Sequence, residues 1–193
     1  MISTVERSVE SARDFQQDNV RSIMNAGESL LARSQLEIGG KYQESFLSSG
    51  APHQLDVNIG HLPHTVDHPL LLFNALLELW TDENVSASER VIVFHEVEPG
   101  EVFIRSKMVT ESGYESRGYG EGMFRFGHRL VYDLLDLDLL RDKSVVWEAI
   151  DTARSLQPGK TRKGWTSRLA LDMGYEPCGI NEFLLPVFRF KFQ

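Results

Sequence analysis

The chain has 193 residues, and its 28 acidic residues outnumber its 20 basic ones, which gives a formal net charge of −8. A hydrophobic fraction of 41% is ordinary for a globular protein, and domains of about 100–200 residues are the norm, so residues 1–193 are predicted to form a single domain. The acidic balance excludes a protein that coats nucleic acid or an anionic membrane with its whole surface.

Residues 1–34 are predicted to form an N-terminal amphipathic helical segment. Ser3 and Glu6 fit a capping box, in which the serine hydroxyl accepts from the backbone N–H of Glu6 and the Glu6 carboxylate reaches back. Apolar residues then recur three or four positions apart, which places them on one face of a helix. They are Val5, Val9, Ala12 and Phe15. Such a face usually docks on its own chain, and the alternative is docking on a neighbouring subunit.

The next stretch is predicted to contain one short strand and one central helix. Residues 35–68 show little sustained periodicity, except at 54–59, where apolar and polar residues alternate as in a strand. Residues 70–80 are apolar nearly throughout and follow Pro69, which suits the first turn of a helix. This pattern predicts a helix that is buried on all sides.

Two strands are predicted to follow the central helix. Residues 90–98 and 101–109 are rich in β-branched and aromatic side chains, and Pro99 and Gly100 between them favour a turn. The five glycines within residues 113–127 then predict a loop.

The last third of the chain is predicted to hold two helices and a strand. Residues 128–140 and 142–157 have helical patterns, and 182–192 alternate as a C-terminal strand with three phenylalanines on one face. The predicted fold is therefore an α+β domain with an N-terminal amphipathic helix and a central buried helix. Its sheet is expected to be small, mixed or antiparallel, and to include the C-terminal strand.

Several features point to the cytoplasm. No basic leader followed by an apolar run opens the sequence, and the apolar stretch at 70–77 is far shorter than the roughly 20 residues that a membrane helix needs. The single cysteine, Cys178, cannot form an internal disulfide and fits a reducing compartment. We expect a cytoplasmic protein, or a virion protein if the chain is viral, with no membrane partner.

A cluster of histidines is the sharpest local motif. Four of them lie within residues 53–68, and imidazole is a common ligand of zinc and iron. The weak candidates for a metal site are His61, His64 and His68. Pro63 and Pro69 bracket the last two, and no established metal-binding spacing is present. A polar loop with a histidine at a helix start is therefore the preferred interpretation, and no cofactor is expected.

Residues 158–168 carry a local charge opposite to that of the whole chain. This stretch holds four basic residues, one tryptophan and no acid. The candidate partner-binding residues are Lys160, Arg162, Lys163, Trp165 and Arg168. Such a loop suits docking on an acidic neighbour, for which the aspartates of residues 133–142 are a counterpart, or contact with phosphate, which would be its only route to nucleic acid. A solvated loop is the alternative.

These patterns favour a non-enzymatic structural or assembly protein, which forms a homo-oligomer or part of a larger complex. An apolar central helix has more surface to cover than one small domain requires, and oppositely charged patches suit contacts between copies. A virion component of the phage neck or tail type is one concrete form. The alternatives are a small metal-dependent enzyme that uses residues 53–68 and a protein-binding effector-type module.

Overall fold

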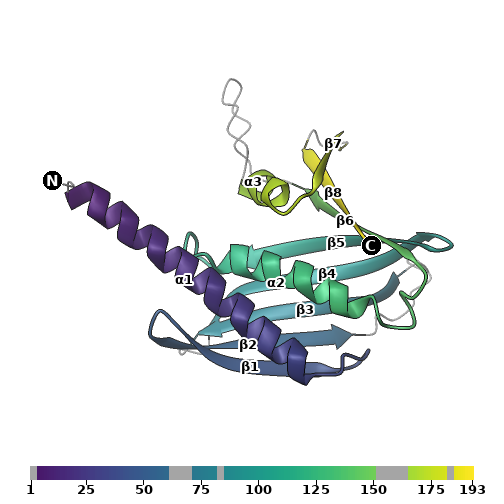
Figure 1. Ribbon diagram of the computed structural model, residues 1–193, viewed down its shortest axis with the longest axis horizontal. Helices are drawn as coiled ribbons and strands as arrows, with labels where there is room; N and C mark the ends of the chain where they lie inside the picture. Colours follow the sequence, from purple (N-terminus) through teal and green to yellow (C-terminus); the bar gives the residue numbers. More distant parts are fainter. Residues whose placement is uncertain (1–3, 61–70, 82–84, 151–164, 182–184) are drawn as a thin grey trace. The chain divides into compact units, whose positions relative to one another are not determined.

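The computed structural model describes residues 4–60, 71–81, 85–150, 165–181 and 185–193 (Figure 1). In this part of the chain, eight strands form one mostly antiparallel sheet with the order β1-β2-β3-β4-β5-β6-β8-β7. The chain divides into two compact units. Unit 1 comprises residues 1–63, 73–92 and 107–141, and unit 2 comprises residues 64–72, 93–106 and 142–193.

Unit 1 is a layer of two helices on one face of a sheet, as Figure 1 shows. Its elements are α1 (Thr4–Arg33), β1 (Lys41–Ser48), β2 (Ala51–Gly60), β3 (Leu71–Thr81), β4 (Ser86–Glu98), β5 (Glu101–Thr110) and α2 (Tyr119–Leu134), with β4 and β5 shared between the units. Alternate residues of β2 and β3 point to the helices and are fully buried. Leu55 and Val57 lie opposite Leu79 and Leu77, and these pairs form the centre of the core.

Glycines let the two helices of unit 1 approach each other closely. A Cβ atom on Gly27 of α1 would lie 2.1 Å from the ring of Phe126, and one on Gly122 of α2 would lie 2.7 Å from Ile23. Both distances are far inside van der Waals contact. The two glycines therefore make room for the large side chains that fill the α1–α2 interface.

Unit 2 contains the remaining helix and strands. They are β6 (Ser144–Ile150), α3 (Trp165–Asp172), β7 (Glu176–Ile180) and β8 (Pro186–Phe192). β6 runs parallel to β5 and antiparallel to β8, and Trp147 on β6 is completely buried. Phe188 and Phe192 of β8 are buried as well, whereas Phe190 between them is partly exposed and packs on Tyr175.

A ladder of alternating charges crosses unit 2. The register places Glu148 of β6 between Arg105 of β5 and Arg189 of β8, and Glu176 of β7 follows as the next partner of Arg189. The guanidinium of Arg189 donates to Oε1 of Glu148 from Nε at 2.9 Å and from Nη2 at 2.7 Å. Opposite charges on neighbouring strands favour this register.

The N-terminal helix and the C-terminal strand are present as predicted, but the predicted fold class is wrong. The sheet is the largest element of the molecule and not a small one. The helix expected at 70–80 does not exist, because residues 71–81 form β3 inside the sheet. One face of β3 is buried and the other is partly exposed, and the partly exposed face also carries the apolar residues Leu72, Leu76 and Trp80. A strand of this kind has the same composition as a buried helix.

Two further predictions for the second half of the chain are also wrong. Residues 144–150 form strand β6 inside the range 142–157 that was expected to be a helix. Helix α2 begins at Tyr119, among the glycines of the range 113–127 that was expected to be a loop. The helix expected at 128–140 forms the second half of α2 and ends at Leu134. Glycine is unfavourable inside a helix by about 1 kcal/mol relative to alanine, and packing against α1 outweighs this cost.

Candidate functional site

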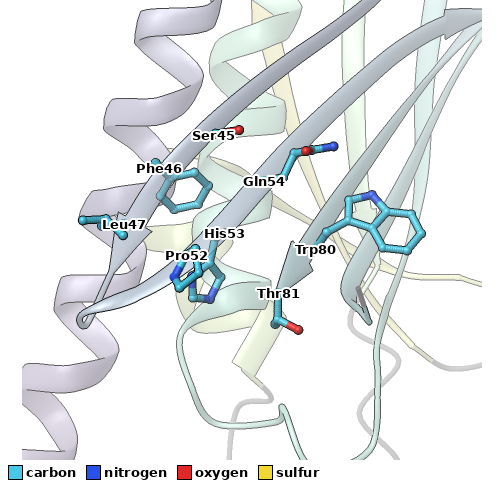
Figure 2. A pocket seen from close by; sticks show the side chains of 8 residues that line it. All are labelled: Ser45, Phe46, Leu47, Pro52, His53, Gln54, Trp80 and Thr81. Carbon is cyan, nitrogen blue, oxygen red and sulfur yellow. The ribbon is translucent and has the colours of Figure 1, made fainter. Parts of the chain in front are cut away.

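A pocket of about 410 Å³ lies at the tip of the β1–β2 hairpin, where β3 ends (Figure 2). Eight residues line it: Ser45, Phe46, Leu47, Pro52, His53, Gln54, Trp80 and Thr81. The strand register places Ser45, Gln54 and Trp80 in one row across the three strands. Phe46, His53 and Thr81 form the next row, on the opposite face. The pocket therefore draws on side chains from both faces of the sheet, at the point where the hairpin extends past β3.

Helix α1 holds the hairpin tip in place. The turn residues Ser49 and Gly50 have positive φ angles of 50° and 80°. The backbone N–H and the hydroxyl of Ser49 both donate to Oδ2 of Asp18 at 3.1 Å. Asn19 is fully buried, accepts from the Ser48 hydroxyl at 2.5 Å and donates to the backbone carbonyl of Arg117 at 2.8 Å. The wall of the pocket is thus tied to α1 and to the segment before α2.

His53 forms a hydrogen-bonded pair with Tyr119 at the base of the pocket wall. Its Nδ1 lies 3.0 Å from the carbonyl oxygen of Ala51, and its Nε2 lies 2.9 Å from the Tyr119 hydroxyl. Because a carbonyl can only accept, Nδ1 donates to Ala51, and Nε2 shares the second hydrogen bond with the Tyr119 hydroxyl. The ring is only 6% exposed and packs on Phe46. Both nitrogens are engaged, so a metal ion at His53 would have to displace one of these hydrogen bonds.

Two polar atoms among the pocket-lining residues are buried without a hydrogen-bond partner. They are Nε1 of Trp80 and Oγ1 of Thr81, and Thr81 as a whole is only 9% exposed. Beside them, the side-chain amide of Gln54 donates to Oδ1 of Asp56 at 2.8 Å. An unpaired buried polar atom costs about 1–3 kcal/mol, and neither atom is exposed to solvent.

A second feature is an acidic cluster, formed by Asp56, Glu78 and Glu89, on the sheet face of unit 1 that points away from α1 and α2. Asp56 of β2 and Glu78 of β3 are direct cross-strand partners. Burial raises the pKa of Glu78, and the charges of Glu89 and Asp56 raise it further. In the described residues no arginine or lysine pairs with these three carboxylates.

The residues predicted from the sequence to bind a partner are only partly described. Lys160, Arg162 and Lys163 lie outside the described residues. Trp165 is the first residue of α3 and is partly buried, and Arg168 is exposed on the same helix.

Two of the four aspartates in the acidic stretch expected as their counterpart have basic partners of their own. Arg129 pairs with Asp133 at 2.7 Å, and Arg141 pairs with Asp138 at 2.8 Å. The unpaired acidic cluster on the sheet is therefore the better complement to a basic segment.

The predicted metal candidates His61, His64 and His68 also lie outside the described residues. Within the part of the chain that the structure describes, no group of three histidine, cysteine or acidic side chains could hold a metal ion.

The pocket and the acidic cluster were not predicted from the sequence, because both depend on which residues share a strand register. Asn74 and Glu78 are polar positions within the largely apolar stretch 71–81. A spacing of four residues places them on one face of a helix as well as on one face of a strand, so the sequence carried no signal that favoured the sheet.

Comparisons with known proteins add little to this picture. No family model matches the chain, and no curated protein matches it. Among solved structures, it is similar to a domain from Methanocaldococcus jannaschii DSM 2661, with a TM-score of 0.37 and 10% sequence identity over 62% of this chain and 67% of that one. In the described residues no helix is both long and apolar enough to cross a membrane. Function is therefore inferred from the residues themselves.

Proposed function

We propose that the protein is a non-enzymatic assembly protein that forms a homo-oligomer, alone or within a larger complex. The acidic cluster supports this proposal. Like charges at directly opposed positions destabilise a sheet. Burial raises the pKa of Glu78, and the charges of Glu89 and Asp56 raise it further. A basic partner on this face would relieve the repulsion.

The partner that fits is the basic stretch 158–168 of a second copy. The net charge of −8 makes two copies of the chain repel each other, whereas residues 158–168 carry a positive charge. Two different patches that meet form a heterologous contact, which closes into a ring or grows into a filament. Exposed ion pairs contribute only about 0–1 kcal/mol each, so we assign most of the affinity to apolar neighbours of the cluster such as Leu76 and Trp80, which are partly exposed.

The experiment is light scattering over a range of protein concentrations at low and high salt. The loop variant carries Lys160→Glu, Arg162→Glu and Lys163→Glu. The face variant carries Asp56→Lys, Glu78→Lys and Glu89→Lys. Each variant alone should form assemblies of lower average mass than the wild type at the same concentration, because charges of the same sign would then face each other at the contact. A chain with both sets of reversals should associate again, since the charges are once more complementary.

A matched control changes three exposed carboxylates outside the cluster, Glu10→Lys, Glu98→Lys and Glu111→Lys, and has the same net charge as the face variant. This control should keep the mass of the wild type. The proposal is wrong if the wild type stays monomeric at all concentrations, or if the face variant and the control behave alike. A monomer that uses the same face to bind a different protein would favour the effector-type module. The virion role stays a prediction.

A further inference from the structure

The outer edge of β1 exposes backbone hydrogen-bonding groups. Among the described strands, β1 stands first in the order of the sheet and pairs with β2 (Figure 1). The N–H of Ile59 on β2 donates to the carbonyl oxygen of Gly40 at 2.9 Å. Because the bonding side alternates along an antiparallel strand, the even-numbered residues of β1 bond to β2, and the odd-numbered residues turn their N–H and C=O groups outward. The outward-facing residues are Lys41, Gln43, Ser45 and Leu47, and all four are exposed.

The β1 edge lacks three features that protect edge strands, namely a proline, a bulge and a very short length. The β1–β2 register runs through all eight residues of β1 without a break, and the strand contains no proline. By contrast, β7 at the other end of the sheet order is five residues long, contains Pro177 and has a register shift before Ile180. The β1 edge is therefore suited to pairing with another strand.

The β1 strand of a second copy completes this edge when the two strands run antiparallel. Hydrogen-bonded pairs must then join outward-facing residues of both copies. One register does so for all four residues: Lys41 lies opposite Leu47 of the second copy, and Gln43 lies opposite Ser45 of the second copy. The two-fold axis then passes at Glu44, and symmetry repeats each pair. A shift of two residues in either direction would leave outward groups at one end of each strand unpaired, so this register forms the most hydrogen bonds.

Side chains on the helix-facing side of β1 support the same register. Tyr42 lies opposite Phe46 of the second copy, and both side chains are partly exposed. Directly opposed residues outside the hydrogen-bonded pairs have Cα atoms only about 4.5 Å apart, and aromatic side chains in such positions stabilise a sheet. The charges of the two Glu44 side chains are balanced, because each pairs with Arg33 of its own chain.

We propose that β1 pairs antiparallel with β1 of a second copy, about a two-fold axis at Glu44, so that one sheet continues through both chains. This contact is isologous, because both copies use the same surface. It rests on the proposed self-association of the chain, but it uses neither the acidic cluster nor residues 158–168. The two contacts can therefore be tested separately.

Amide hydrogen exchange measured by nuclear magnetic resonance tests the pairing on the full chain. The loop variant defined above is used, because its reversed charges remove the contact with the acidic cluster. The outward amides of Gln43 and Ser45 should exchange about tenfold more slowly at high than at low protein concentration. The inward amides of Tyr42 and Phe46 bond to β2 and should exchange slowly at every concentration. Exchange at Gln43 and Ser45 that does not depend on concentration would overturn the proposal.

Disulfide formation tests the register. In a chain that carries Cys178→Ser, the substitution Glu44→Cys places two cysteines across the two-fold axis, at a Cα separation of about 4.5 Å that a disulfide accepts. Oxidised glutathione should convert most of this chain into a covalent dimer. The matched control is Gln17→Cys, at an exposed position of α1, and it should stay monomeric. Equal yields of dimer from the two variants would overturn the proposed pairing.

Light scattering separates this contact from that of the proposed assembly. The edge variant, Gln43→Lys with Ser45→Lys, brings lysines opposite each other across the two strands and should lower the average mass. The control, Gln17→Lys with Ser112→Lys, adds the same charge at exposed positions and should keep the mass of the wild type. Failure of the assembly contact would show as a loop variant with the mass of the wild type, whereas failure of the β1 pairing would show as an edge variant with the mass of the control. The proposal is also overturned if the β1 amides of a monomer are protected only by an added extended peptide.

Discussion

Acidification from pH 7 to pH 5 should destabilise the protein through one histidine. His128 lies on α2, is only 9% exposed and packs edge-on against Tyr132. Burial disfavours the charged imidazolium and lowers the pKa of His128 from 6.5 to about 4 in the folded protein. In the unfolded chain the same group takes up its proton near its ordinary pKa.

The sign and the size of the effect follow from these two pKa values. The unfolded state binds the proton first, so stability is fully present above pH 6.5 and is lost as the pH falls toward 4. At pH 5 the histidine is almost fully protonated in the unfolded chain and mostly neutral in the folded one. At about 1.36 kcal/mol per pKa unit, the loss at pH 5 is about 2 kcal/mol. For a chain of this length it corresponds to a fall in Tm of about 4–8 °C.

Thermal unfolding followed by circular dichroism at pH 7, 6 and 5 measures this loss, with the variant His128→Gln as the control. Glutamine does not titrate, so the variant should show a flatter dependence of Tm on pH than the wild type. The imidazole resonances of His128 should titrate in the folded protein with a midpoint near pH 4. A midpoint above about 6, or equal pH dependence in both proteins, would refute the assignment of His128 as a buried neutral group.

Three further outcomes test the packing of unit 1. Asn19→Ala removes the hydrogen bonds that join α1 to Ser48 and to the segment before α2. Chemical denaturation should show that the free energy of unfolding falls by about 1–3 kcal/mol. A fall of less than about 0.5 kcal/mol would contradict this role. Glu78 has a raised pKa because it is partly buried beside Glu89 and Asp56, which penalises folding once the pH rises through the folded pKa. Glu78→Gln should therefore raise Tm at pH 7 and have a smaller effect at pH 4, and a Tm that falls at pH 7 would contradict the shift. Gly27→Ala should favour an isolated helix by about 1 kcal/mol. In the folded protein it should lower the stability, because the added methyl overlaps the ring of Phe126. A higher Tm would contradict close packing between α1 and α2 at this position.

The elements that were predicted correctly depend on local signals. The N-terminal helix follows from a capping box and a helical repeat of apolar residues, and its bounds are Thr4–Arg33. The strands β4 and β5 follow from β-branched residues on both sides of Pro99 and Gly100, and Gly100 has the positive φ of 84° that such a turn requires. In each case the preference for a helix, a strand or a turn comes from residues that are close together in the sequence, so the sequence alone determines the element.

Where tertiary packing outweighs local preference, the prediction from sequence was wrong. Leucine-rich residues 71–81 suit a helix as well as a strand, and only their place between β2 and β4 makes them a strand. The glycines near residue 120 favour a loop locally, but α2 forms there because close packing against α1 requires small residues.

The candidate pocket and the acidic cluster were decided by tertiary structure alone. Asp56 and Glu78 are far apart in the sequence, and the β2–β3 register makes them direct neighbours. The same register brings Ser45, Gln54 and Trp80 into one row at the pocket. A shift of one residue between strands would turn each of these side chains to the other face. Sequence patterns specify which residues can form strands, and the packing of the assembled sheet against its helices selects the register that creates a site.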